Sequence, residues 1–233
     1  MAGAVDDRDA AWRMSIVIPA LNEAEGIAET LRALQAMRSD GHEIILVDGG
    51  SQDATVALAA SQVDRLVCSA PGRATQMNAG AAVASGAALL FLHADTRLPE
   101  DACTLVSDAL ARAAWGRFDV QILGKHRMLG CIAWLMNLRS RLTGIATGDQ
   151  AIFVRRDTFR ALGGFSAIPL MEDIEICTRL RRITRPACLV AKVSTSGRRW
   201  ESHGVWRTMF LMWGLRLAYA LGIPPRVLAR RYG

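Results

Sequence analysis

The stretch IVIPALNE (residues 16–23) decides the fold, because a run of β-branched residues ends there abruptly in an amide and a carboxylate. The same change from apolar to polar residues occurs in VDGGSQD (residues 47–53) and in LHADT (residues 92–96). The carboxyl end of a buried parallel strand has this pattern when it delivers polar groups into a ligand crevice. A further segment, PLMED (residues 169–173), adds an isolated acidic pair. Helix capping alone does not explain these junctions together with that pair.

The order of elements around these segments predicts an α/β protein. Short apolar runs predict strands over residues 15–18, 43–47, 65–68 and 88–92, with helical spacing between them. Such alternation implies a parallel, twisted sheet with right-handed crossovers. The second half predicts strands over residues 117–123 and 151–155, a helix over 172–183, and a mixed apolar and arginine-containing stretch over 128–142. The boundary near residue 115 therefore separates two halves of one domain.

Composition limits the class of protein. At 233 residues the chain is expected to form one domain with a substantial core. The formal net charge of +6, carried mostly by arginine, points to anionic partners: nucleotide phosphates, an acidic membrane surface or nucleic acid. No basic stretch is interleaved with aromatic residues, so nucleic acid is not an expected partner.

Cysteine usage and the amino-terminal residues predict a cytoplasmic protein. The cysteines form no CxxC pair and have no histidine at metal-finger spacing, as is usual in a reducing cytosol. Residues 1–12 are charged and lack an apolar signal-peptide core, so a flexible tail is expected over residues 1–13. No uninterrupted apolar run reaches the ~20 residues of a membrane span. The protein is therefore expected in the cytoplasm, either free or peripheral at the cytoplasmic face of the membrane.

Taken together, the segments resemble the family-2 glycosyltransferases, which are inverting sugar-nucleotide transferases with the GT-A fold. The resemblance runs from about residue 15 to residue 200, and residues 148–173 resemble a compact bacterial branch with poorly defined substrates. It implies a Rossmann-like α/β fold with a mixed, mainly parallel sheet flanked by helices. The catalytic domain would span residues 14–203, with a nucleotide-binding half at 14–115 and an acceptor half at 116–203.

The resemblance also implies a donor site for a nucleotide-diphosphate sugar, a UDP-sugar above all. Pro19, Glu23 and Asp48 would line the nucleoside pocket, with Asp48 facing the edge of the base. Arg73 follows a glycine and would reach a phosphate or the base. A solvated helix face explains this arginine nearly as well.

The LHADT segment stands in the place of the family's Asp-x-Asp metal motif, with a histidine where the first aspartate is expected. Asp95 would hold a divalent cation, Mn²⁺ or Mg²⁺, because such ions suit carboxylate and phosphate oxygens. Its alternative role is to cap the helix near Pro99. His93 would bond the ribose, and His203 would add a metal ligand or touch the diphosphate, although a lone histidine is more often structural.

The acidic pair supplies the predicted catalytic groups. An acceptor hydroxyl must lose a proton as it attacks, so a carboxylate is needed within hydrogen-bond reach. Asp173 matches the family's general base and stands at a helix start, where backbone N–H groups favour an ionised carboxylate. Glu172 points about 100° away around the helix and would orient the site. On the simpler interpretation both acids only complement the helix dipole.

Asp149 and Gln150 are expected to face the acceptor. The segment RRW (residues 198–200) is similar to the end of the Gln-x-x-Arg-Trp motif of processive family members, which puts Arg199 and Trp200 on the acceptor side as well. The glutamine of that motif is absent, with Thr195 or Ser196 near its place. A non-processive transferase is therefore expected.

Residues 204–233 predict an amphipathic helix and a basic tail. Apolar residues recur there at helical spacing, which fits either core packing or an interfacial face. They are Trp206, Met209, Phe210, Trp213 and Leu217, and they are accompanied by Arg207, Arg216, Arg226, Arg230 and Arg231. Contact with a membrane surface would favour a lipid as the hydroxyl acceptor.

The predicted function is metal-dependent, inverting transfer of a sugar from a nucleotide-diphosphate sugar to a hydroxyl group. One alternative is a nucleotidyltransferase on a related sheet, which would not need Asp173 as the base for a hydroxyl. A second is a sugar-nucleotide-binding or membrane-docking module without turnover. The presence of both Asp95 and Asp173 argues against that module.

Overall fold

The computed structural model describes residues 12–232, apart from the side chains of Arg199, His203 and Tyr232. The tail predicted over residues 1–13 therefore lies almost wholly outside the described residues. An eight-stranded sheet has the order β3-β2-β1-β4-β7-β6-β8-β5. Its strands are β1 (Met14–Ala20), β2 (Glu43–Asp48), β3 (Arg65–Cys68), β4 (Ala88–Phe91), β5 (Thr96–Arg97), β6 (Trp115–Leu123), β7 (Phe153–Arg155) and β8 (Ala187–Ser196).

The sheet is mixed and mainly parallel, as predicted. β1 pairs in parallel with β2 and β4, β2 pairs with β3, and β6 pairs with β8. β7 is antiparallel to both β4 and β6, and β5 is antiparallel to β8. The β4–β7 and β5–β8 pairs each join a strand from before residue 115 to one from after it. Both predicted halves therefore contribute to one sheet.

Strands β1, β5 and β8 differ from the prediction, and the sequence pattern predicts no strand over the two residues of β5. The predicted first strand ends before Pro19, but β1 continues to Ala20, whose carbonyl accepts a hydrogen bond from the Gly49 N–H at 2.9 Å. The sequence pattern predicts no strand over β8. Half-exposed positions alternate with buried ones along its second half, and serine and threonine occupy several of them, so no continuous apolar run marks it.

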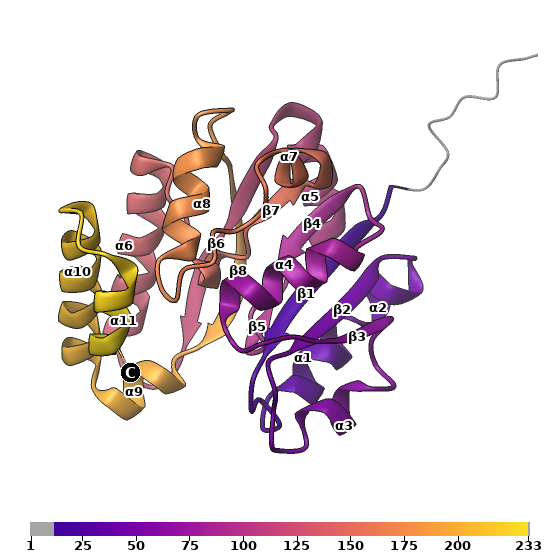
Figure 1. Ribbon diagram of the computed structural model, residues 1–233, viewed down its shortest axis with the longest axis horizontal. Helices are drawn as coiled ribbons and strands as arrows, with labels where there is room; N and C mark the ends of the chain where they lie inside the picture. Colours follow the sequence, from indigo (N-terminus) through magenta and orange to yellow (C-terminus); the bar gives the residue numbers. More distant parts are fainter. Residues whose placement is uncertain (1–11, 233) are drawn as a thin grey trace, which may run out of the picture.

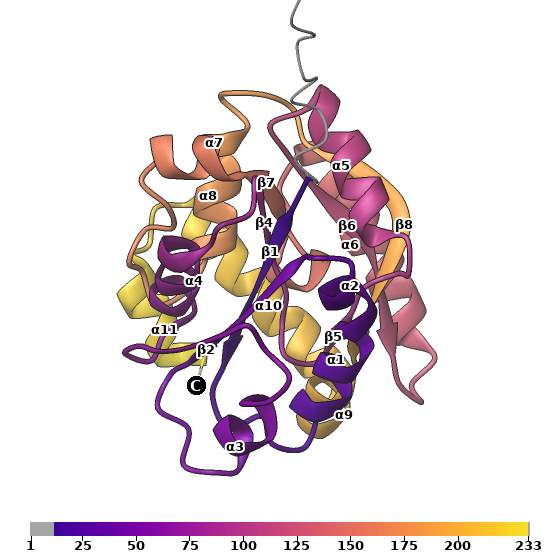
Figure 2. The ribbon, with the colours of Figure 1, turned by 90° about the vertical axis from the view of Figure 1, so that its right-hand side faces the viewer.

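Helices cover both faces of the sheet. Side chains of β1 point alternately to these two faces. Ile16 and Ile18 face one core cluster, and Val17 faces the other. Figure 2 shows α4, α7 and α8 on one side of the strands and α1, α2 and α5 on the other. The helices are α1 (Ile27–Ala33), α2 (Gln35–Ser39), α3 (Thr55–Ala59), α4 (Arg73–Val83), α5 (Ala102–Arg112), α6 (Met128–Thr143), α7 (Arg156–Ala161), α8 (Glu172–Leu180), α9 (Arg198–His203), α10 (Val205–Ala220) and α11 (Pro225–Tyr232), with a 3₁₀ turn η2 (Gly148–Gln150).

The C-terminal segment forms two helices, which corrects the prediction of one helix and a basic tail. α10 and α11 contact each other at one end of the molecule (Figure 1). Leu215 of α10 and Leu228 of α11 form a small buried cluster with Leu170 and Met171. Among the described residues, no helix is both long and apolar enough to cross a bilayer.

Candidate functional site

The polar segments that follow β1, β2 and β4 meet η2 and the start of α8 at one edge of the sheet. These strands are parallel and adjacent, so their carboxyl ends open at the same edge. η2 leads into β7, which pairs with β4. The Gly148 N–H of η2 donates a hydrogen bond to Asp173 Oδ2 at 3.1 Å. This bond brings the start of α8 to the same edge.

The predicted nucleoside residues Pro19 and Asp48 lie at neighbouring strand ends. Pro19 pairs with Val47, the residue before Asp48. The Asp48 carboxylate is buried and its Oδ2 accepts hydrogen bonds from the N–H groups of Gly50 (2.9 Å) and Ser51 (3.0 Å). These bonds fix the turn after β2 and hold the carboxylate at the end of the strand.

Gln76 of α4 supports this edge, and the sequence does not predict that role. Its side chain is buried, and Nε2 donates hydrogen bonds to the carbonyls of Ala20 (2.8 Å) and Val47 (2.9 Å). The two carbonyls belong to neighbouring strand ends, so one amide ties α4 to both. These partners lie 56 and 29 residues away along the chain, and no local pattern reveals them.

Glu23 shares the electrostatic environment of the metal motif. Burial raises the pKa of Glu23, and the nearby Asp95 carboxylate raises it further. The positive charges of Arg198, His93 and Arg73 act in the opposite direction. A cation beside Glu23 and Asp95 would offset the repulsion between their negative charges.

His93 connects the metal motif to the turn that carries Asp149. Its Nδ1 lies 3.2 Å from Asp149 Oδ1. A Cβ at position 148 would lie 2.4 Å from His93 Nε2, so the close approach of the ring requires Gly148. Because Gly148 also bonds Asp173, His93 and the acidic pair both lie against the η2 turn.

Asp95 is half-buried beside the threonines that join β5 to β8. The Thr195 hydroxyl donates to Asp95 Oδ1 at 3.5 Å, and the Thr96 hydroxyl donates to Thr195 Oγ1 at 3.1 Å. Within residues 12–232, no cluster of three His, Cys, Asp or Glu side chains could hold a metal, and the side chain of His203 lies outside the described residues. A cation at Asp95 would therefore take its remaining ligands from phosphate oxygens and water, which suits Mg²⁺ or Mn²⁺.

Asp173 and Glu172 begin α8 in contrasting surroundings. Glu172 is buried, whereas Asp173 keeps a partly exposed face and its Oδ1 accepts the Ile174 N–H at 2.7 Å. Burial raises the pKa of Asp173. Burial, followed by the charge of Asp173, raises the pKa of Glu172 as well. A carboxyl group that is enclosed but still reachable is suited to accept a proton.

The residues predicted on the acceptor side lie in different places. Gln150 is fully buried, with Oε1 accepting the Thr147 N–H (3.2 Å) and Nε2 donating to Asn137 Oδ1 (3.3 Å). It supports η2 and does not face an acceptor, which corrects the expectation. Trp200 is half-buried and packs against the main core. The side chain of Arg199 lies outside the described residues.

An apolar surface lies on α10. We call it the outer face of α10. It consists of Trp206, Phe210, Trp213 and Leu217, each more than half exposed. The Trp206 and Phe210 rings stack with their centroids 6.4 Å apart. Met209, which the sequence groups with these residues, is instead buried.

Comparison with known proteins agrees with this geometry. Residues 15–160 match the description Glycosyl transferase family 2. A PGL/p-HBAD biosynthesis glycosyltransferase of Mycobacterium bovis (strain BCG / Pasteur 1173P2) is 32% identical over 177 residues. The match covers 67% of this chain and 64% of the length of that relative.

Solved structures share the fold at low sequence identity. A mannosyltransferase of Pyrobaculum calidifontis, in complex with GDP-Man and Mn²⁺, has a TM-score of 0.61 at 22% identity, covering 78% of this chain and 56% of that chain. TarS of S. aureus, in complex with UDP-GlcNAc, has a TM-score of 0.63 at 17% identity, covering 79% of this chain and 58% of that chain. These likenesses confirm the predicted GT-A fold. Together with the match over residues 15–160, they show that the chain belongs to glycosyl transferase family 2.

Proposed function

We propose that the protein transfers a sugar from a nucleotide-diphosphate sugar to a hydroxyl group, with inversion and in single, non-processive additions. The observation that carries the proposal is the enclosed Asp173 carboxyl group, held by backbone N–H groups next to the motif of His93 and Asp95. A UDP-sugar is the proposed donor. TarS binds UDP-GlcNAc and the mannosyltransferase binds GDP-Man, so both nucleotides belong in the test.

Asp173 acts in this proposal as the general base. Each of its carboxylate oxygens accepts one backbone N–H, and each has a further lone pair for a substrate hydroxyl. As the hydroxyl oxygen attacks the anomeric carbon, its proton passes to Asp173. Glu172 lies beside it with a raised pKa, which limits the negative charge of the pair.

The donor nucleotide would lie along the edge formed by Pro19 and Asp48, with its diphosphate toward Arg73. Arg73 is the first residue of α4, and a helix N-terminus attracts phosphate groups. Burial raises the pKa values of Glu172 and Asp173, and the charge of Arg73 partly opposes that rise. Its charge acts on Glu23 as well, so Arg73 influences both Glu23 and the acidic pair.

Asp95 would hold the divalent cation, with diphosphate oxygens as further ligands. Thr195 fixes Oδ1 of this carboxylate, and Oδ2 has no hydrogen bond to any described residue, so Oδ2 is available to the ion. When bound, the cation neutralises the negative charge that grows on the departing diphosphate. The Mn²⁺ in the mannosyltransferase complex supports this choice of ion.

Inversion and single addition follow from the groups proposed for the reaction. One base serves one attacking hydroxyl, which enters opposite the leaving diphosphate, so the configuration at the anomeric carbon is inverted. Thr195 stands near the place of the glutamine in the processive motif, and its hydroxyl donates a hydrogen bond to Asp95. The absence of that glutamine supports single addition. Asp149, Arg199 and Trp200 remain the proposed residues of the acceptor side.

We also propose that the protein works at the cytoplasmic face of a membrane, with a lipid as its hydroxyl acceptor. The outer face of α10 is the supporting observation, because exposed Trp and Phe side chains suit the interface between lipid and water. Arg207, Arg226 and Arg231 are exposed on the same helix pair and would attract anionic headgroups.

The test incubates the full chain with UDP-sugars and GDP-sugars in the presence of Mn²⁺. We expect one nucleotide sugar to raise the melting temperature, since a ligand at 100 Kd stabilises by about 2.7 kcal/mol. That donor should release its nucleoside diphosphate, and NMR should find the opposite anomeric configuration in the product. A folded chain that neither binds nor turns over any of these donors would contradict the proposal, and retention would reject inversion.

A further inference from the structure

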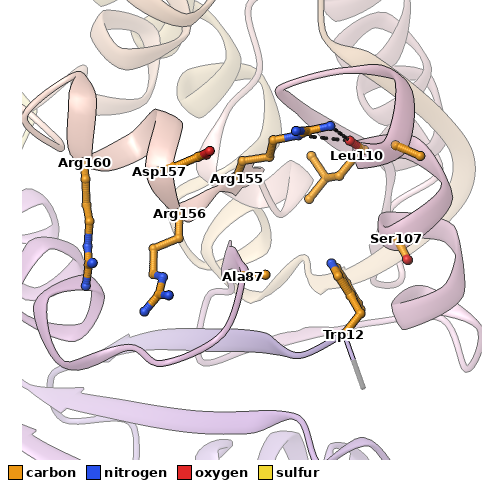
Figure 3. A pocket seen from close by; sticks show the side chains of 9 residues that line it. Trp12, Ala87, Ser107, Leu110, Arg155, Arg156, Asp157 and Arg160 are labelled. Atoms are coloured by element: carbon orange, nitrogen blue, oxygen red, sulfur yellow. Dashed lines mark hydrogen bonds between the residues drawn. The ribbon is translucent and has the colours of Figure 1, made fainter. Parts of the chain in front are cut away.

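A cavity of about 610 Å³ lies at the edge of the sheet opposite to the candidate site. Trp12 and Ala87 line it just before the amino ends of β1 and β4, and Leu110 of α5 lines the facing wall. Arg155, Arg156 and Arg160, from the end of β7 and from α7, complete it (Figure 3). The groups proposed for sugar transfer stand at the carboxyl ends of the same strands, so they do not contribute to this cavity.

The three arginines, Arg155, Arg156 and Arg160, form no ion pair with any residue that the structure describes. Asp157 is the acidic residue in the lining, and its Oδ1 accepts hydrogen bonds from the backbone N–H and the hydroxyl of Thr158. Among its described lining residues the cavity therefore carries three arginines and one carboxylate, an excess of positive charge.

The guanidinium groups of the three arginines differ in their hydrogen bonds. Arg155 donates from Nε to the Leu110 carbonyl at 3.0 Å, which fastens β7 to α5 and fixes the wall. Arg156 donates from Nη1 to the Ala84 carbonyl at 3.0 Å, and its Nε and Nη2 make no hydrogen bond to a described residue. Arg160 follows one helical turn later and extends in the same direction (Figure 3). Like charges at this spacing repel each other, and a bound anion would remove that repulsion.

The rest of the lining is mostly apolar and includes Trp12, Ala87 and Leu110. The Trp12 ring meets His42 edge to face, with centroids 5.8 Å apart, and this contact helps to fix its orientation. Indole faces accept stacked planar rings. We infer that this cavity is a second ligand site, which binds a small phosphorylated molecule with a flat ring, of the nucleoside monophosphate class. Its phosphate would bridge Arg156 and Arg160, and its ring would lie against Trp12. This inference does not depend on the proposed sugar transfer.

The experiment is calorimetric titration of the full chain with adenosine monophosphate in EDTA, which removes divalent cations from the candidate catalytic edge. We expect one-to-one binding that weakens at least tenfold in the double variant Arg156→Ala/Arg160→Ala and also in Trp12→Leu. Arg112→Ala, at the exposed end of α5 and outside the lining, is the matched control and should bind like wild type. Inorganic phosphate and adenosine should each bind more weakly than the nucleotide.

Other outcomes would overturn the inference. Absence of binding by the folded wild type rejects the site, and so does equal binding by the double variant. Loss of binding in Asp48→Asn would assign the nucleotide to the edge formed by β1 and β2 instead. Inorganic phosphate that binds as tightly as the nucleotide would reject the role of Trp12 and of the ring.

Discussion

Asp173 can be tested without disturbing its neighbours, because asparagine has nearly the same shape but accepts no proton. Asp173→Asn should lower transfer by about 10²-fold or more, the usual share of general-base catalysis, while donor affinity stays close to wild type. The measurement is kcat at saturating donor. Glu175→Gln, on the same helix and paired with Arg179, is the control and should keep its activity. Transfer by Asp173→Asn within a few-fold of wild type would show that another group takes the proton.

The same residue fixes the pH dependence. Burial raises the pKa of Asp173 above the 3.8 of an ordinary aspartate, and the base works only when ionised. Transfer should therefore rise as pH increases through the raised pKa, so the acid limb of kcat/KM should lie above the range of an exposed carboxylate. The residual activity of Asp173→Asn should lack this limb. An unchanged limb in that variant would assign it to a different group.

Asp95 is the residue on which metal dependence is expected to rest. Asp95→Ala removes the proposed ligand and leaves Thr96 and Thr195 to bond each other, so the fold should persist. Donor binding, measured by titration with and without Mn²⁺, should lose its response to the ion. Asp108→Ala, an exposed acid on α5, should retain that response. A full Mn²⁺ effect in Asp95→Ala would mean that the ion is held elsewhere.

Among the elements, α10 has one buried face and one exposed apolar face. Leu215 packs beside Met171, whereas Trp213 and Leu217 of the outer face are 54% and 64% exposed. Replacing the last two by serine should therefore weaken binding to anionic vesicles without loosening the cluster around Met171. Arginines near an anionic surface add about 1 kcal/mol each, so wild-type binding should also fall as salt rises.

Co-sedimentation with anionic liposomes measures this effect. Val190→Ser removes an exposed apolar side chain of β8, 72% exposed, and serves as the control. It should bind vesicles like wild type. Failure of the wild-type protein to bind anionic vesicles at low salt would remove the membrane from the proposal and leave the sugar transfer untouched.

For the whole molecule, the shared sheet predicts cooperative unfolding. β4 pairs with β7 and β5 pairs with β8. Neither half can therefore unfold without breaking strand hydrogen bonds to the other half. Tryptophan fluorescence reports mostly on residues after 114, while far-UV circular dichroism reports on the entire chain. Their denaturant transitions should coincide. Separate midpoints would show that the halves unfold independently.

The first half of the fold is predictable because its central strands are buried on both faces. β1, β2 and β4 therefore appear as nearly unbroken apolar runs, and the polar residue after each run marks the site. β8 has half-exposed positions and an irregular pairing with β6 between Phe118 and Asp119, so its sequence carries no comparable pattern.

The parts of the site that the sequence leaves out depend on distant contacts. Gln76 of α4 donates hydrogen bonds to carbonyls of β1 and β2, and the close approach of the His93 ring requires a glycine at position 148. Gln150 shows the opposite error, because a polar residue next to a motif was expected to face substrate and is instead bonded internally. Local patterns identify polar residues near the site, but the fold determines which of these side chains are bonded internally and which can contact a substrate.

The order of the chain also bears on how such an enzyme diversifies. α10 and α11 come after the last strand in the chain, and they reach the acidic pair through the cluster of Leu215 and Leu228 with Leu170 and Met171. Natural selection can therefore alter the outer face of α10 without rebuilding the sheet. Substitution of Leu215 or Leu228 is constrained more tightly, because these side chains pack with Met171, the residue before α8. One helix pair thus combines an exposed surface that can change freely with a buried attachment that cannot.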